Sequence, residues 1–189
     1  MTALELRPSD TGLVVIDAQE RLVRVMPDER AEEATRNTVT LLEAARRLGL
    51  PVVATEQYPE GLGRTIEPVA AALGRFDPPV TPISKLEFSA LGRPEALAAI
   101  RAAARRTWIV AGMETHVCVW QTVRGLLQEG REVHVVADAC LSRRDENWRL
   151  GLDLCARAGA VVTSTEVAVF DLLGRAGTDD FRALSKLVK

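Results

Sequence analysis

Leu13–Val14–Val15–Ile16 is a run of four apolar residues that ends at an acidic residue, Asp17. A short run that is apolar at every position, rather than at alternate positions, is typical of a strand buried on both faces of a sheet. Comparable runs recur at residues 52–55, 80–83, 107–111, 133–137 and 161–163. Because longer segments separate these runs, the pattern predicts strands that alternate with helices.

The intervening segments carry helical patterns. Residues 29–48 place apolar side chains about one turn apart, and Gly49 follows directly. Further helices are expected at residues 93–105, 118–129 and 145–158, with a last helical region after Glu166. Residues 58–79 are expected to form a surface excursion. We therefore predict an α/β fold in one domain over residues 1–189, a three-layer α/β/α sandwich around a parallel sheet.

The composition gives expectations about binding partners and about the cellular compartment of the protein. The 189 residues are 47% hydrophobic, which is enough for one core, and the formal net charge is −2. This mild charge gives no reason to expect a nucleic acid partner, and the apolar runs are too short to cross a bilayer. Residues 1–10 lack the features of a signal peptide. The three cysteines contain no C-x-x-C pair, so we expect neither a disulfide framework nor a zinc knuckle, and a cytoplasmic location.

Three chemically useful side chains lie near the ends of predicted strands. Asp17 follows the first strand, Lys85 lies just after the third, and Cys118 opens the helix after the fourth. Because open parallel sheets bind ligands at the carboxyl ends of their strands, we expect the three to converge. Each alone has an ordinary explanation, as a helix cap, a surface lysine or a buried apolar thiol.

Together the three side chains predict a hydrolytic site. A helix N-terminus and the Lys85 cation favour a thiolate at Cys118. Asp17 can accept the thiol proton and later activate water. Gly112 permits a sharp exit from the fourth strand. Backbone N–H groups at the start of the following helix are placed to hold an oxyanion.

The segments around these residues resemble a known family. They read VVIDAQE around Asp17, ISKLEFSAL around Lys85 and VAGMETHVCVWQT around Cys118. In this order they resemble the isochorismatase-like cysteine hydrolase superfamily, over most of the chain. TEQYPEGLG from Thr55 and ADACLSR from Ala137 are closest to its branch of isochorismatase-domain proteins.

The resemblance implies a six-stranded parallel sheet, an Asp17–Lys85–Cys118 triad and a cis peptide bond between Met113 and Glu114. It also implies that the backbone N–H groups of Glu114 and Cys118 form the oxyanion hole. The implied reaction is hydrolysis of a small amide-type C–N bond through a covalent thioester. Self-association is expected from the family alone, where dimers and larger oligomers are common.

Two departures from relatives narrow the expected chemistry. Nicotinamidases hold a metal with an Asp and several His residues after the second strand, but the corresponding segment here, TEQYPEGLGRT, contains no histidine. We therefore expect no metal and no cofactor. True isochorismate hydrolases lack the nucleophilic cysteine, so Cys118 argues against their vinyl ether reaction. The expected substrate is a small molecule, with no nucleic acid or membrane partner.

Other residues have more than one interpretation. Four side chains are candidates for the walls of a substrate pocket, although a core or surface role is open for each: Gln19, Tyr58, Phe88 and Trp120. His116 suggests a Cys–His mechanism, but we favour a packing role because the triad already supplies a base and a cation. Cys140 and Cys155 are expected to be packing groups.

Two functions from other classes stay open. In the first, the protein is a thiol sensor in which Cys118 is oxidised reversibly, although the sequence offers no obvious resolving cysteine. In the second, the chain is a non-catalytic interaction module that retains the fold. The intact set of three residues favours an enzyme over either alternative.

Overall fold

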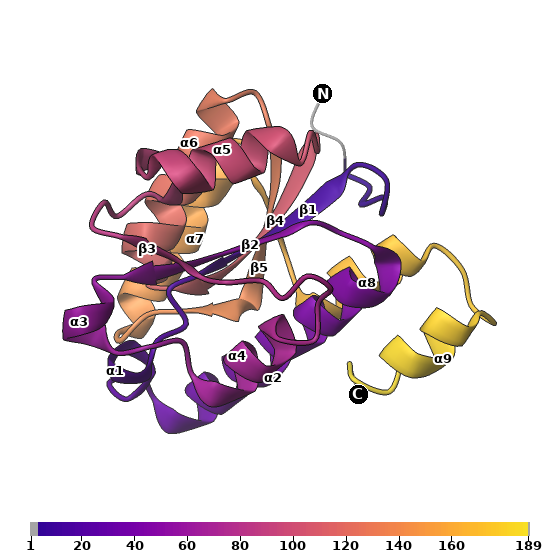
Figure 1. Ribbon diagram of the computed structural model, residues 1–189, viewed down its shortest axis with the longest axis horizontal. Coiled ribbons are helices and arrows are strands. Elements are labelled where there is room, and N and C mark those ends of the chain that lie inside the picture. The colour runs from indigo at the N-terminus through magenta and orange to yellow at the C-terminus, as the bar shows by residue number, and fades with distance from the viewer. Residues whose placement is uncertain (1–3, 189) are drawn as a thin grey trace.

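The computed structural model describes residues 4–188 (Figure 1). Six strands form one sheet in the order β3-β2-β1-β4-β5-β6, and every neighbouring pair is parallel. The strands are β1 (Thr11–Ile16), β2 (Val52–Gln57), β3 (Ile83–Lys85), β4 (Thr107–Met113), β5 (Glu132–Leu141) and β6 (Val161–Thr163). The predicted α/β class and parallel sheet are therefore confirmed.

The described residues 4–188 also contain nine α-helices and two short helices of other types, and the last two α-helices follow the last strand. The α-helices are α1 (Glu20–Val23), α2 (Asp28–Leu48), α3 (Pro59–Leu62), α4 (Glu67–Leu73), α5 (Pro94–Ala102), α6 (Trp120–Gln128), α7 (Asp145–Arg157), α8 (Thr165–Leu173) and α9 (Asp179–Leu184). The others are the 3-10 helix η1 (Ala90–Gly92) and the π-helix η2 (Thr115–Val119). None of these helices combines the length and apolar character needed to span a bilayer.

The sheet separates two apolar cores, as the fully apolar strands require. In β1, Leu13 and Val15 contribute to one core, whereas Val14 and Ile16 contribute to the other. Helices α2, α4 and α8 pack on the first core, and α5, α6 and α7 pack on the second (Figure 1). This arrangement gives the three-layer α/β/α sandwich and leaves the carboxyl ends of the strands at one edge.

Two sequence-based expectations about the segment after β2 are wrong. The expected surface excursion over residues 58–79 contains α3 and α4, and Val69 and Leu73 of α4 are buried in the first core. The third strand lies at Ile83–Lys85 rather than at residues 80–83. Pro82, which has no N–H to donate, precedes the strand, so the strand begins after it.

Candidate active site

The structure brings Asp17, Lys85 and Cys118 together at the carboxyl edge of the sheet. Asp17 follows β1 directly, Lys85 is the last residue of β3, and Cys118 lies in η2 just after β4. The Nζ atom of Lys85 lies 2.7 Å from Oδ2 of Asp17, and both side chains are completely buried. The negative charge of the same carboxylate raises the pKa of the Cys118 thiol. Asp17 is thus the group that the other two share.

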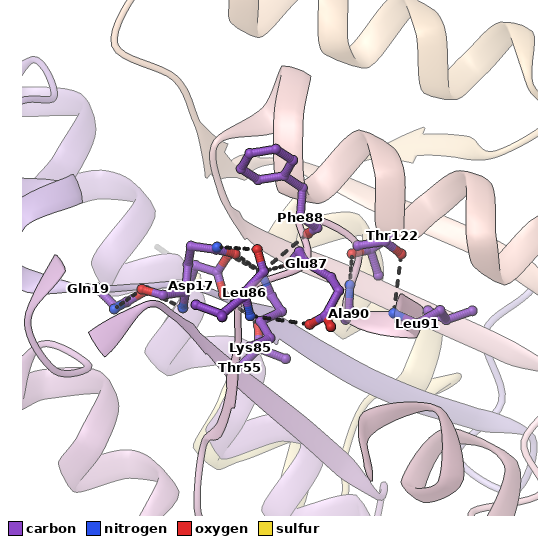
Figure 2. A network of polar contacts seen from close by, with 12 residues as sticks. Asp17, Gln19, Thr55, Lys85, Leu86, Glu87, Phe88, Ala90, Leu91 and Thr122 are labelled. Carbon is purple, nitrogen blue, oxygen red and sulfur yellow. Dashed lines mark hydrogen bonds and ion pairs between the residues drawn. The ribbon is translucent and has the colours of Figure 1, made fainter. Parts of the chain in front are cut away.

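Lys85 is held in one position by several acceptors, as Figure 2 shows. Its Nζ donates to Asp17 Oδ2 and Gln57 Oε1, both at 2.7 Å. The backbone carbonyls of Glu87 and Phe88 lie at 3.2 Å from the same nitrogen. An ammonium has three N–H donors, so the acceptors around Lys85 satisfy all of them. This buried environment excludes an ordinary surface role for the lysine.

Thr55 and Gln57 of β2 belong to the site, and the sequence analysis did not select them. Thr55 Oγ1 donates to Asp17 Oδ1 at 2.7 Å, so both oxygens of that carboxylate have partners. Gln57 accepts from Lys85, and its Nε2 donates to the Leu86 carbonyl at 2.8 Å. Both residues stand at the carboxyl end of a central strand, which is the signal that identifies them.

The Cys118 thiol is a weaker acid than the sequence suggested. Burial raises the pKa of Cys118 to about 12; the negative charge of Asp17 also raises it, whereas the Lys85 cation acts in the opposite direction. Cys118 also lies inside η2 rather than at the first position of a helix. The expectation of a thiolate at Cys118 is therefore wrong, because burial outweighs the effect of the Lys85 cation. At neutral pH the thiol is protonated, and attack requires a base.

Alkylation of Cys118 by iodoacetamide is expected to accelerate about tenfold per pH unit between pH 7 and 9, because only the thiolate reacts and its pKa lies far above this range. Cys118 is also expected to react before the other cysteines, since 6% of its surface is exposed against 1% for Cys140 and 0% for Cys155. Peptide mapping after limiting reagent measures both. A rate independent of pH, or earlier labelling of Cys140 or Cys155, would contradict the expectation.

The turn between β4 and η2 has an unusual backbone conformation at two successive positions. Gly112 has a φ of 124°, and a Cβ atom there would lie 2.0 Å from the Ile16 carbonyl oxygen. Only glycine permits this approach of β4 to β1. The peptide bond between Met113 and Glu114 is cis, as expected. The Glu114 carboxylate points to the segment after β5, where Oε2 accepts from the Arg143 backbone N–H at 2.9 Å and from its Nε at 3.1 Å.

Gln19 does not have the free amide that a substrate-binding role requires. Its Nε2 donates to the carbonyls of Gln57 and Gly63 at 3.0 and 2.7 Å, and its Oε1 accepts from the Gln57 N–H at 2.7 Å. The side chain is completely buried. These contacts tie the end of β2 to the loop before Arg64, so Gln19 supports the site rather than offering donors to a ligand.

The three aromatic candidates lie near the edge of the site. Tyr58 donates its backbone N–H to the Lys85 carbonyl at 2.9 Å, and its side chain is exposed. Phe88 is also exposed, and its ring points away from the Asp17–Lys85 pair (Figure 2). Trp120 is the first residue of α6 and is partly buried. Their placement is compatible with a rim around the thiol.

His116, Cys140 and Cys155 contact other protein groups or lie in the core, as expected for packing residues. His116 Nδ1 lies 3.1 Å from the Ser142 hydroxyl oxygen, which favours the packing role over a Cys–His mechanism. Cys140 and Cys155 are buried in the second core, and the Cys140 thiol lies 3.7 Å from the Val110 carbonyl oxygen. Burial raises the pKa of Cys140 and raises the pKa of Cys155 to about 12.

The Glu56 side chain of β2 does not fit the role of a metal ligand, because protein groups already contact both of its oxygens. Glu56 is buried and its Oε1 accepts from the N–H and the hydroxyl of Thr65 at 2.7 and 2.8 Å, while Arg64 contacts Oε2 at 3.1 Å. Across residues 4–188 no group of three or more His, Cys, Asp or Glu side chains is arranged to hold an ion. The Glu56 carboxylate instead fixes the loop between β2 and α4.

Sequence comparison finds relatives along nearly the whole chain. The model of the isochorismatase domain matches residues 11–167. The secreted isochorismatase effector Isc1 of Phytophthora sojae is 36% identical over 188 residues, which cover 97% of this chain and 87% of the effector. Isochorismatase domain-containing protein 2 of Bos taurus is 34% identical, with 96% of this chain and 84% of that protein covered.

Solved structures share the architecture. A structure described as MAR1 ribonuclease from Caenorhabditis elegans has a TM-score of 0.87 and 32% identity, and the match covers 97% of this chain and 92% of that one. The YcaC gene product of Escherichia coli, described as an octameric hydrolase of unknown specificity, has a TM-score of 0.90. Its identity is 21%, with 99% and 92% of the two chains covered, so this second likeness concerns the fold alone.

Proposed function

The chain belongs to the isochorismatase family of hydrolases, and on that premise we propose that it cleaves a small amide-type C–N bond through a thioester on Cys118. The observation that supports this most directly is the shared carboxylate. The Asp17 carboxylate pairs with the Lys85 ammonium at 2.7 Å, its charge raises the pKa of the Cys118 thiol, and all three side chains are buried. A carboxylate whose charge acts on a protonated thiol is the arrangement that general-base activation of a thiol needs.

In the proposed first half-reaction, Asp17 accepts the thiol proton as the Cys118 sulfur attacks the amide carbon. The S–C bond forms, and the carbonyl oxygen becomes an oxyanion that accepts from the backbone N–H groups of Glu114 and Cys118. The C–N bond then breaks, and the proton held by Asp17 goes to the leaving nitrogen. Lys85 keeps the Asp17 carboxylate in place through the 2.7 Å ion pair.

In the second half-reaction, water hydrolyses the thioester. Asp17 accepts a proton from the water as its oxygen attacks the thioester carbon, and the same oxyanion donors bind the carbonyl oxygen. The C–S bond breaks, the acid leaves, and the proton returns from Asp17 to the Cys118 sulfur. One carboxylate thus serves both halves, which fits its ion pair with Lys85 and its effect on the pKa of the thiol.

The test is ammonia release from a panel of aliphatic and aromatic primary carboxamides, with wild type beside Cys118→Ala. The wild type is expected to release ammonia from at least one member and the variant from none. Mass spectrometry after rapid acid quenching should show the acyl group on Cys118. A short RNA added as a separate arm tests the activity named for the nematode relative. RNA cleavage without amide turnover, or amide turnover retained by Cys118→Ala, would refute the proposal.

Tyr58, Phe88 and Trp120 are proposed to form the pocket wall because all three lie beside the strand ends that carry the triad. Their rings offer apolar surface, which suits an amide with an apolar group attached to its carbonyl. We also propose self-association, by analogy with the octameric bacterial hydrolase of the same fold.

Activity is expected to survive exhaustive chelation. The physical reason is that the Glu56 carboxylate is already bound by Thr65 and Arg64, and the proposed nucleophile is a thiol rather than a metal-bound water. The measurement is ammonia release before and after dialysis against chelator, with metal content followed by atomic emission. Activity that disappears with the metal and returns on adding zinc or iron would overturn this expectation.

A further inference from the structure

The segment that joins β5 to α7 is tied to the proposed oxyanion turn at two points. Ser142 and Arg143, which follow β5, contact His116 and Glu114, which follow β4. The Glu114 carboxylate accepts from both the backbone N–H and the Nε of Arg143 through the same oxygen. The two contacts lie on either side of Thr115, the residue that begins η2.

The two partners of the Arg143–Glu114 ion pair are unequally buried. The Glu114 side chain is 9% exposed, whereas the Arg143 side chain is 60% exposed. An exposed arginine gains little stability from a surface ion pair, but a nearly buried carboxylate needs its hydrogen bonds. The contact therefore fixes Glu114 more than it fixes Arg143.

Helix α7 closes the other side of η2. A Cβ atom added at Gly151 of α7 would lie 2.8 Å from the backbone N of His116 and from the carbonyl carbon of Thr115. No side chain fits between the two backbones at this point. The turn that holds Cys118 is thus confined by α7 and by the segment before it.

We propose that Arg143 and Ser142 are positioning residues that hold the backbone N–H of Glu114 where the oxyanion forms. Arg143 acts through the Glu114 carboxylate, and Ser142 acts through His116. The inference rests on the proposed function, since it assigns residues to the oxyanion hole of that reaction. Ser142 and Arg143 end the ADACLSR segment, which has no role in the triad itself.

A reversible aldehyde probe tests the positioning without an amide substrate. Propionaldehyde adds to the Cys118 thiol: the S–C bond forms, the C=O bond becomes a hydroxyl, and the thiol proton ends on that oxygen. Because the new oxygen occupies the oxyanion position, its binding reports on the donors. Protection of Cys118 against iodoacetamide measures the binding, and alkylation without aldehyde measures the thiol itself, since alkylation needs no oxyanion donor.

Four variants give an expected order. Glu114→Ala removes the acceptor and is expected to weaken aldehyde protection about tenfold or more. Arg143→Ala retains the backbone N–H contact, and Glu114→Gln retains an acceptor, so each is expected to weaken it by a smaller factor. Arg101→Ala breaks the exposed Arg101–Glu129 ion pair and should leave protection unchanged. Alkylation without aldehyde should keep the wild-type rate in the two arginine variants. It should be equal or faster in the two Glu114 variants, because the Glu114 charge raises the pKa of Cys118. Thermal melting verifies folding.

The outcomes separate this inference from the proposed function. Ordered loss of protection without any loss of alkylation supports the positioning role, even if no carboxamide is hydrolysed. Amide turnover would then add the expectation that Glu114→Gln lowers kcat more than it raises KM. Wild-type protection in Glu114→Ala, loss of alkylation in parallel with protection, or no protection of the wild type by propionaldehyde would each overturn the inference.

Discussion

Asp17→Asn is expected to lower amide turnover by about 10²–10⁴-fold, the range that a general base contributes, while Cys118 alkylation stays constant or becomes faster. An amide of the same shape preserves packing but cannot accept the thiol proton. The substitution also removes the negative charge that raises the pKa of Cys118. The thiol should therefore be more acidic and yet less able to complete a catalytic cycle.

The measurement pairs ammonia release with the iodoacetamide rate on the same preparations. Asp153→Asn is the matched control, because it makes the same chemical change in an exposed ion pair with Arg157 on α7. That control should leave both rates at the wild-type value. If Asp17→Asn slows alkylation and turnover by the same factor, Asp17 acts by maintaining the thiol environment rather than by accepting its proton.

Lys85→Met is expected to lower the free energy of unfolding by about 3–5 kcal/mol, the cost of leaving one partner of a buried ion pair without the other. Methionine approximates the length of the lysine stem, so the change isolates the loss of the ammonium. The Asp17 carboxylate would then remain buried, with Thr55 as its hydrogen-bond donor. Adding Asp17→Asn in the same chain should recover a large part of the lost stability, since no buried charge then lacks a partner.

Urea denaturation of the wild type, both single variants and the double variant gives the comparison. Arg101→Met breaks an exposed ion pair and is expected to cost about 0–1 kcal/mol. A Lys85→Met variant as stable as the Arg101→Met control would mean that the buried ion pair does not contribute to the free energy of unfolding. A double variant less stable than both single variants would show that the Asp17–Lys85 attraction is not the source of the effect.

The sequence predicts the central strands well because their chemistry is local. The run Leu13–Ile16 is apolar at every position, and β1 lies between β2 and β4 with both faces covered. The sequence also predicts that Asp17, Lys85 and Cys118 lie near strand ends, because the order of strands and helices determines which residues reach the carboxyl edge of a parallel sheet. Periodicity does not detect short helices such as α3 and α4, because four to seven residues contain too few repeats.

The pKa of Cys118 could not be predicted from the sequence, for a different reason. The nearby charges can be guessed from motifs, but the desolvation that dominates the pKa depends on how completely the other layers cover the thiol. The roles of Thr55 and Gln57 depend likewise on the register of β2 against its neighbours. These properties arise from packing between segments distant in the chain.

The ion pair between β1 and β3 also has a consequence for aggregation. Strand β2 lies between them, and β3 is an edge strand of only three residues. The hydrogen bonds from Lys85 to Asp17 and Gln57 therefore hold this short edge strand against the sheet. If that strand detaches, the backbone N–H and C=O groups along one side of β2 become available to another chain. We therefore expect Lys85 to limit edge-to-edge association, and variants at this position should form β-rich aggregates more readily than variants at Cys118.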